Sequence, residues 1–310
     1  MSLIKKPCEL EIQPKIKMLI YGQAGIGKST LALSAPRPLL FDFDGGINRV
    51  NYSFIKDTVQ IHSYEECLSV LNTEDLSSYD TIVIDTGGKC LDYMDAFIIK
   101  GNPRLGKANG VLTLQGYGER KRTFIALCKL INEKQKHVVF VAHRQQIQDG
   151  DDIRYIPLFG GSAYDSLATE LDLIGYMEAN GRKRTITFDP TSRSDGKNTC
   201  YMPSVVEVPT VLDDKGNVIG ENDFITKSVI TPYIENIKLR VEEGKKYNKV
   251  VEEIKEQIEL ITDAKSANDF VSRIDEFKHV GSSKAMAAKL LQTKTASLKI
   301  TFDSKLKKYV

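Results

Sequence analysis

Short apolar runs alternate with longer amphipathic segments over the first 230 residues of the chain. The runs are typical of strands buried in a parallel sheet, where both faces are covered and polar residues come at the strand ends. The segments between them repeat apolar residues at helical spacing, which is typical of helices packed on such a sheet. We therefore predict strands at residues 16–21, 39–44, 79–86 and 138–142, and helices at residues 30–35, 63–71, 89–99, 119–134 and 163–171.

This alternation predicts an α/β fold, with a mainly parallel central sheet flanked by helices. Further strands, partly at the sheet edge, are predicted at residues 171–178, 182–189 and 223–228. The polar residues 145–157, which include an Asp-Gly-Asp-Asp sequence, indicate a loop or a hairpin.

The composition changes after Pro232. Long helical segments follow at residues 247–260, 267–277 and 284–292, with breaks between them. This part shows no chemical motif, and its charges are most simply a solvated face. We therefore predict two domains: a core over residues 1–232 and a helical C-terminal region over residues 233–310 that contacts another subunit or a partner.

Composition narrows the class of protein. The chain has 310 residues, of which 41% are hydrophobic and 27% charged, as in an ordinary soluble globular protein. Its net charge of +2 argues against a strongly basic nucleic-acid-binding tail but leaves room for a local basic patch. No apolar run is long enough to span a bilayer, and the first residues do not resemble a secretion signal. The five cysteines are scattered, which favours reduced thiols in a cytoplasm over a zinc site.

The clearest chemical signal is the sequence Gly-Gln-Ala-Gly-Ile-Gly-Lys-Ser-Thr, between the first predicted strand and the first predicted helix. It fits the phosphate-loop pattern, in which backbone N–H groups surround the phosphates of a nucleotide. The lysine reaches the β- and γ-phosphates, and the serine hydroxyl binds Mg²⁺. A glycine-rich turn could match the pattern by chance, but the strand before it and the helix after it favour a site for ATP and Mg²⁺. The nucleotide-binding residues are Gly22, Gln23, Ala24, Gly25, Ile26, Gly27, Lys28, Ser29 and Thr30.

Carboxylates end two of the other predicted strands. Asp42 and Asp44 close one strand, and Asp85 closes another. Parallel strands present their carboxyl ends to the ligand crevice, so these side chains are expected to point towards the nucleotide. Asp85 lies about sixty residues after the phosphate loop, where an aspartate holds Mg²⁺ in this class of protein.

Two further polar regions are candidates for function. His143 and Arg144 follow the strand at residues 138–142, where a polar side chain can sense the γ-phosphate or be present by chance. Residues 100–118 contain several glycines and three cations, and a loop this long is usually functional or disordered. It is either a solvated surface loop or a contact surface for a polyanion or a neighbouring subunit.

The order of these motifs resembles the RecA-like recombinase core, and more closely the phage-encoded nucleotide-binding proteins that are reduced relatives of RecA. The resemblance extends over roughly residues 15–230. It implies that Asp44 is the general base that activates water, where RecA has a glutamate. It also implies that Asp85 is associated with Mg²⁺ and that His143 and Arg144 lie at the γ-phosphate sensor.

The same resemblance implies that residues 100–118 and 144–162 are DNA-binding loops. Lys197, with Arg184 or Arg193 as alternatives, falls where the family directs a cation at the γ-phosphate of the neighbouring subunit. Tyr117 and Phe159 could stack on bases or could be packing residues. The residues expected to contact DNA are Lys100, Arg104, Lys107, Tyr117, Arg144, Gly160 and Gly161.

The function that follows is a DNA-dependent ATPase acting on single-stranded DNA in phage recombination or strand annealing, in a bacterial cytoplasm. Its expected partners are single-stranded DNA, further copies of the chain in a ring or filament, and a single-strand-binding or annealing protein. One alternative is a replication accessory ATPase, either a helicase or a helicase loader. Another is a nucleotide-switched binding protein with little turnover.

Overall fold

A computed structural model describes residues 14–310, apart from residues 151, 162 and 163. The chain divides into two compact units, one ending at Ile234 and the other comprising residues 235–310. The division falls within the long helix α6 (Thr231–Glu259). No helix of the described residues is long and apolar enough to cross a membrane.

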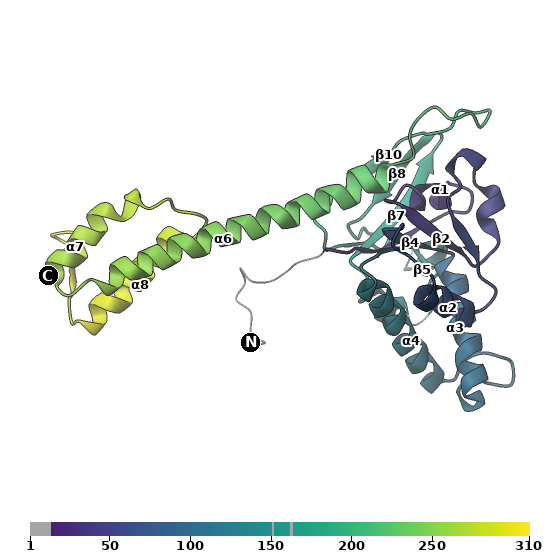
Figure 1. Cartoon of the computed structure of the whole chain (residues 1–310), viewed down its shortest axis with the longest axis horizontal. Coiled ribbons are helices and arrows are strands. Elements are labelled where there is room, and N and C mark those ends of the chain that lie inside the picture. Colours follow the sequence, from purple (N-terminus) through teal and green to yellow (C-terminus); the bar gives the residue numbers. More distant parts are fainter. Residues whose placement is uncertain (1–13, 151, 162–163) are drawn as a thin grey trace. The chain divides into compact units, whose positions relative to one another are not determined.

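Ten strands of the described chain form one sheet at the centre of the first unit (Figure 1). Its main order is β10-β8-β7-β1-β5-β4-β2-β3, with β6 paired to β5 and β9 paired to β7. The strands from β7 to β3 run parallel to one another, whereas β6, β8, β9 and β10 pair antiparallel. The sheet is mainly parallel, as predicted. The strands are β1 (Lys17–Gly22), β2 (Pro38–Asp42), β3 (Thr58–Gln60), β4 (Thr81–Asp85), β5 (His137–Asp149), β6 (Asp152–Pro157), β7 (Leu173–Asn180), β8 (Lys183–Thr187), β9 (Lys197–Asn198) and β10 (Val205–Val208).

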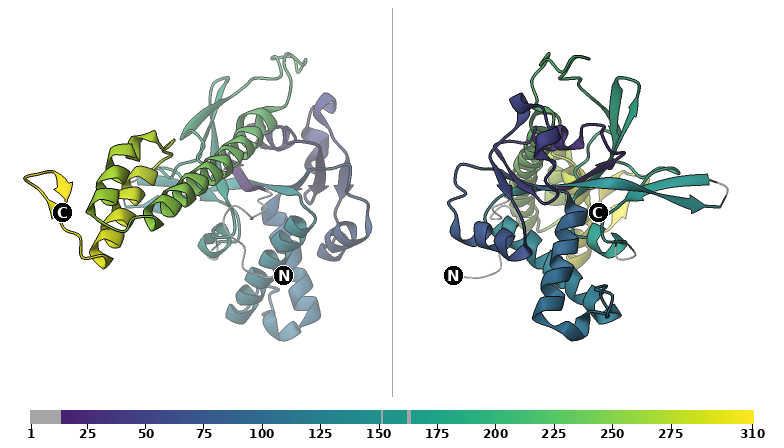
Figure 2. Two further views of the ribbon diagram at one scale, coloured as in Figure 1. Left: turned by 60° about the vertical axis from the view of Figure 1, so that its left-hand side comes forward. Right: turned by 90° about the vertical axis from the view of Figure 1, so that its right-hand side faces the viewer.

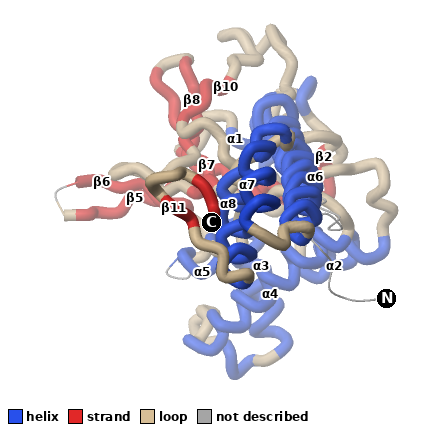
Figure 3. The backbone as a smooth tube through the Cα atoms, turned by 90° about the vertical axis from the view of Figure 1, so that its left-hand side faces the viewer, coloured by secondary structure: helices blue, strands red, loops and turns tan. Residues whose placement is uncertain are grey.

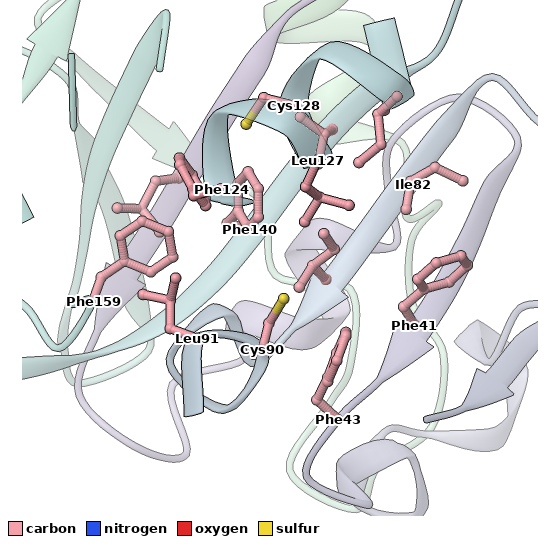
Figure 4. Close-up of a cluster of buried hydrophobic side chains, with 14 of the residues drawn as sticks. Phe41, Phe43, Ile82, Cys90, Leu91, Phe124, Leu127, Cys128, Phe140 and Phe159 are labelled. Carbon is pink, nitrogen blue, oxygen red and sulfur yellow. The ribbon is translucent and has the colours of Figure 1, made fainter. Parts of the chain in front are cut away.

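Successive residues of the central strands face opposite sides of the sheet, and each side has its own core. In β1, Leu19 and Tyr21 belong to one hydrophobic cluster, while Met18 and Ile20 belong to the other. Phenylalanine rings from several elements meet in the first cluster (Figure 4). Helices α2 (Tyr64–Thr73), α3 (Gly87–Gly101) and α4 (Leu114–Glu133) cover that side, and the short helix α1 (Lys28–Ala32) covers the other.

Two segments differ from the prediction. Residues 223–228 are predicted as a strand, but residues 224–228 are helical and lead through the π-helical turn Ile225–Ile230 into α6. Phe224 and Ile225 pack in the cluster on the side of the sheet that α1 covers, so tertiary contacts override strand propensity. Helix α4 begins at Leu114 rather than at residue 119, because the Thr113 side chain caps it by accepting a hydrogen bond from the N–H of Gly116. The loop predicted at residues 100–118 is correspondingly shorter.

A β-hairpin extends from the edge of the sheet where β5 continues beyond Ala142 (Figure 2). Strand β6 pairs with this extension from Arg144 opposite Pro157 to Asp149 opposite Asp152. The hairpin alternative for residues 145–157 is therefore confirmed. Helix α5 (Tyr164–Ala168) follows and is shorter than the helix predicted at residues 163–171.

The second unit is mainly helical, as predicted (Figure 3), and has its own hydrophobic cluster. Helix α6 packs on α7 (Ala264–Arg273) and α8 (Ser283–Ser297) through residues that include Ile254, Phe270 and Leu291. A small antiparallel hairpin, β11 (Phe302–Asp303) with β12 (Lys308–Tyr309), follows α8. The sequence analysis did not predict this hairpin.

Candidate functional site

The carboxyl ends of four parallel strands bring the candidate residues to one edge of the sheet. Gly22, at the end of β1, lies opposite His143 on β5. Asp42, at the end of β2, lies opposite Asp85 at the end of β4. The phosphate loop, the two acidic strand ends and the end of the central β5 segment are thus neighbours, although they are far apart in the sequence.

The phosphate loop has the backbone conformation that its glycines allow. Gly25 and Gly27 have φ angles of +79° and +93°, in the left-handed region that other residues rarely adopt. Gly27 is also the N-cap of α1, and it provides no side-chain hydrogen bond to the first turn. Left-handed residues of this kind are typical of the nests in which backbone N–H groups bind anions.

Lys28 is a buried cation with little compensation. Its side chain is 6% exposed, and its Nζ donates a hydrogen bond to the carbonyl of Gln23 at 2.7 Å. Burial lowers the pKa of Lys28 to about 8, and the nearby carboxylate of Asp85 opposes this shift. A phosphate group would supply the negative charge that this ammonium group lacks.

Asp85 is the counterpart of Lys28 on the acidic side of the site. It is 6% exposed and accepts a hydrogen bond from the Ser29 side chain. Burial raises its pKa to about 6, the Ser29 hydrogen bond lowers it, and the charges of Asp44 and Asp42 raise it further. A hydroxyl and a carboxylate in contact are oxygen ligands of the kind that Mg²⁺ prefers, so these two residues fit a Mg²⁺ site.

No group of three or more metal-ligating side chains occurs among the described residues.

The two aspartates after β2 differ in their partners. The carboxylate of Asp42 accepts hydrogen bonds from the backbone N–H groups of Gly46 and Ile47, at 2.9 and 3.2 Å. It therefore holds the turn rather than pointing freely towards the nucleotide, contrary to our expectation. Asp44 pairs through Oδ2 with Arg49 at 3.0 Å, while its buried Oδ1 has no hydrogen-bond partner within the described structure. Asp44 thus has the acceptor oxygen that remains available.

Arg49 is a site residue that no sequence pattern indicated. It ends the 3₁₀ helix Gly46–Arg49, which turns the chain back so that its guanidinium group reaches Asp44. The Gly-Gly turn before it gave a signal for the change of direction, but no motif indicated which cation would return to the carboxylate. Arg49 also contributes to the electrostatics of His143, as described next.

His143 lies beside the charged groups of the site. Its ring is partly exposed, and its pKa is lowered by partial burial and by the positive charges of Lys28 and Arg49, against the opposing effect of Asp44. A lowered pKa keeps the imidazole neutral near pH 7, so one ring nitrogen can donate and the other accept a hydrogen bond.

Arg144 connects the phosphate loop to the base of the β5–β6 hairpin. Its Nη2 donates a hydrogen bond to the side-chain oxygen of Gln23 at 3.3 Å, and its Nη1 donates one to the Tyr176 hydroxyl at 2.8 Å. The guanidinium carbon lies 4.1 Å from the centre of the Tyr155 ring. The rings of Tyr155 and Tyr176 stack with an interplanar angle of 14°, and this stacking helps to hold the Tyr155 ring against the Arg144 guanidinium group.

The residues expected to contact DNA have different environments. Lys100 forms an ion pair with Glu65 at 2.7 Å, whereas Arg104 and Lys107 are exposed. Phe159 is fully buried among other phenylalanines, so the packing alternative holds for it (Figure 4).

A cavity of about 350 Å³ is lined in part by Tyr117, Arg120, His143, Gly160 and Gly161.

Two of the three cations expected to act on a neighbouring subunit are bound within their own chain. Lys197 donates hydrogen bonds from Nζ to the carbonyls of Ala168 and Thr169, both at 3.0 Å, at the end of α5. Arg184 donates from Nε to the carbonyl of Ile26 in the phosphate loop, at 3.0 Å. Arg193 is exposed and lines a cavity together with Gln23 and Arg144.

A further cavity, of about 270 Å³, adjoins the other side of the phosphate loop. Ile26, Gly27 and Thr30 line it, together with residues of the segment that follows β10. Its volume is close to that of known small-ligand pockets, and it begins where the phosphate loop enters α1.

Comparison with known proteins gives a family. The family described as "AAA domain" matches residues 14–200, which is more than half of the chain. A search of curated proteins finds no match. Among solved structures, a DnaB-like replicative helicase, described together with its interactions with primase, is similar with a TM-score of 0.43 and 12% sequence identity. That alignment covers 66% of this chain and 57% of the helicase chain, so the chain spans little more than half of its length.

Proposed function

Because the chain belongs to the AAA-domain family of P-loop ATPases, we propose that it binds and hydrolyses ATP with Mg²⁺ and couples this reaction to single-stranded DNA. We further propose that it is a RecA-like protein of the phage-encoded kind, acting in homologous recombination or strand annealing. The observation that carries the ATPase proposal is the meeting of Lys28, the Ser29–Asp85 pair and the free oxygen of Asp44 at one edge of the sheet.

The phosphate loop would bind the triphosphate. Lys28 would exchange the Gln23 carbonyl for phosphate oxygens, which compensate its buried charge better than a neutral acceptor does. The cavity beside Thr30 would accept the nucleoside, because it begins at the point where the phosphate loop passes into α1. Mg²⁺ held near Ser29 and Asp85 would neutralise the charge of the phosphates.

Asp44 would position the attacking water. Its unpartnered Oδ1 would accept the hydrogen bond and then the proton of that water, while Arg49 holds the other carboxylate oxygen. His143, kept neutral by its neighbours, would donate a hydrogen bond to the γ-phosphate. His143 lies within β5 and Asp44 lies two residues after β2, so the sheet would help to keep both in position.

Arg144 would transmit the state of the nucleotide to DNA. It touches Gln23 of the phosphate loop and packs on Tyr155 at the base of the hairpin, so a movement of either side displaces it. DNA would lie against residues 100–118 and 144–162. In an oligomer with ATP at the subunit interfaces, Arg193 is better available than Lys197 to reach a neighbouring subunit, because Lys197 already caps α5.

Two observations favour the alternatives. The second unit has a separate core and could dock a partner, as a helicase or helicase loader requires. The ion pair of Asp44 with Arg49 restrains a base that is already one methylene shorter than glutamate, which favours a nucleotide-switched protein with little turnover. Each alternative predicts a different response to DNA.

The test is ATP hydrolysis measured with and without single-stranded DNA, for the wild-type protein, Lys28→Ala and the surface control Lys56→Ala. We expect stimulation by DNA in the wild type and the control, and its loss in Lys28→Ala. If the rate of ATP hydrolysis is the same with and without DNA, the proposed coupling of hydrolysis to DNA is rejected and the helicase-loader function is favoured. ATP binding without hydrolysis would favour the nucleotide-switched function.

A further inference from the structure

The charges of the chain are strongly segregated. Residues 278–310 contain eight lysines, one aspartate and no other acidic or basic residue except a histidine, which gives a formal charge of +7 when histidine is neutral. The whole chain has a net charge of only +2, so the remaining residues are acidic overall. A local positive potential of this kind attracts polyanions even on a nearly neutral protein.

The lysines nearest the β11–β12 hairpin are exposed and available. Lys284 and Lys294 of α8 form ion pairs with Asp275 and Glu259. In contrast, no ion pair within the described structure involves the four lysines of what we name the basic hairpin. Its residues are Lys299, Phe302, Lys305, Leu306, Lys307 and Lys308.

The only acidic residue in this segment shapes the turn instead of neutralising it. Oδ1 of Asp303 accepts hydrogen bonds from the backbone N–H groups of Lys305 and Leu306, at 2.7 and 3.0 Å. Lys307 adopts a left-handed φ of +50° and completes the turn. The carboxylate therefore orders the turn that presents the lysines to solvent.

The basic hairpin also presents an aromatic ring on a firm support. Asn268 of α7 donates to the carbonyl of Tyr309 at 2.8 Å and accepts from its N–H at 2.9 Å. The Tyr309 ring packs against the core of the second unit, whereas Phe302 is 55% exposed. The ring centroids of Phe302 and Tyr309 lie 5.1 Å apart with an interplanar angle of 68°, and this contact leaves the Phe302 side chain largely exposed.

From this combination we infer that the basic hairpin is a second nucleic-acid-binding site, which takes a single strand by its phosphates and stacks a base on Phe302. Exposed lysines that follow a backbone, next to an aromatic ring that accepts any base, are the features of sequence-tolerant single-strand binding. The site lies in the unit without the phosphate loop, so its binding does not require ATP or the proposed hydrolysis.

An acidic membrane surface is the competing partner for a basic segment with apolar residues. A membrane-surface segment gathers its apolar side chains on one face and its cations on the other. In the basic hairpin, Leu306 instead stands between Lys305 and Lys307 in the turn. This interleaving favours a nucleic acid.

The test is the binding of a fluorescent oligothymidine to the full chain without nucleotide, in the Lys28→Ala background and over a range of salt concentrations. The first variant combines Lys305→Gln, Lys307→Asn and Lys308→Gln, since asparagine tolerates the left-handed position. The matched control combines Lys246→Gln, Lys249→Gln and Lys255→Gln, which remove the same charge from exposed positions of α6 in the same unit. We expect the first variant alone to reduce the slope of log K against log salt by about 2, because three phosphate contacts are lost.

The variant Phe302→Leu tests the stacking contact. It should weaken oligothymidine binding about tenfold and leave the binding of heparin, a polyanion without bases, unchanged. Equal losses in the hairpin and α6 variants would overturn the inference, because they would reflect net charge alone. Binding to vesicles with acidic lipids that depends on the hairpin, with oligothymidine binding unaffected by any hairpin variant, would assign the surface to a membrane instead.

Discussion

Lys28 and Asp85 are two buried charges that the nucleotide-free protein compensates only in part. Burial moves the pKa of the lysine down to about 8 and that of the aspartate up to about 6, so both shifts report a cost of keeping the group ionised. Ser29 and the opposite charge offset some of this cost. Sites that bind a charged ligand commonly retain such groups at the expense of stability.

Asp85→Asn should therefore stabilise the nucleotide-free protein while it abolishes Mg²⁺-dependent hydrolysis. Asp85 has a folded-state pKa of about 6 against 3.8 without the fold, so its stabilising contribution is fully present below pH 3.8 and is lost as the pH rises through 6. Asparagine does not ionise, so the variant does not lose this stability as the pH rises. Its advantage in the free energy of unfolding should grow between pH 4 and 6 and reach about 3 kcal/mol above pH 7. Denaturant unfolding at pH 4 and pH 8 checks it, and an equal effect at both would contradict it.

Gly46→Ala should disturb the proposed base without touching the phosphate loop. A Cβ at this position would come within 2.6 Å of both Asp44 Oδ1 and Arg49 Nη2. Because both side-chain ends can move, the fold should survive while Asp44 shifts. We expect kcat to fall by about tenfold or more and the affinity for ATP to change little. Gly101→Ala is the control, since nothing lies within 4 Å of a Cβ there. An unchanged kcat would argue against Asp44 as the base.

At the scale of elements, the strand β5 has two parts with different structural roles. Its first half is a buried central strand, and its second half leaves the sheet and forms the hairpin with β6. Arg144 lies where the central part of β5 ends and the hairpin begins, and it contacts the phosphate loop and the Tyr155 ring. A conformational change at the phosphate loop can therefore be transmitted to the β5–β6 hairpin through the Arg144 side chain.

Tyr155→Leu should weaken this connection, because it removes the ring on which the Arg144 guanidinium lies. We expect the ratio of DNA-stimulated to unstimulated hydrolysis to fall several-fold, with the Kd for ATP unchanged. Tyr155→Phe keeps the ring and should retain the wild-type ratio. If both variants behave alike, the stacking contact does not carry the coupling.

At the scale of the molecule, the core residues of the first unit are separate from those of the second. This separation implies that the two units respond independently to mutation. Ile254 is fully buried in the core of the second unit, and Ile82 is fully buried in the core of the first. Their contacts lie within different units, so a cavity in one should leave the core of the other intact.

Ile254→Ala should destabilise the second unit by about 2–5 kcal/mol, through lost burial and a residual cavity. Hydrogen exchange should show faster exchange in α7 and α8, with protection of β1 and β4 unchanged and ATP still bound. Ile82→Ala should give the opposite pattern. Loss of protection in both units with either variant would show that the cores are coupled.

Features that depend on neighbouring residues could be predicted from the sequence. The phosphate loop is consecutive, so its glycines, Lys28 and Ser29 were identifiable together, and strand and helix periods predicted the mainly parallel sheet. Asp85 was predicted because a buried parallel strand directs its last residue to the ligand edge. The roles of these residues remain predictions.

Contacts between distant segments are known only from the tertiary structure. It separated Asp42, which holds a turn, from Asp44, which keeps a free oxygen, and it paired Asp44 with Arg49. It made residues 224–228 helical, because the apolar side chains of Phe224 and Ile225 gain more from packing on the sheet than strand propensity offers. It also bound Lys197 to the end of α5. Long-range packing and charge pairing determine these outcomes, and a local pattern does not encode them.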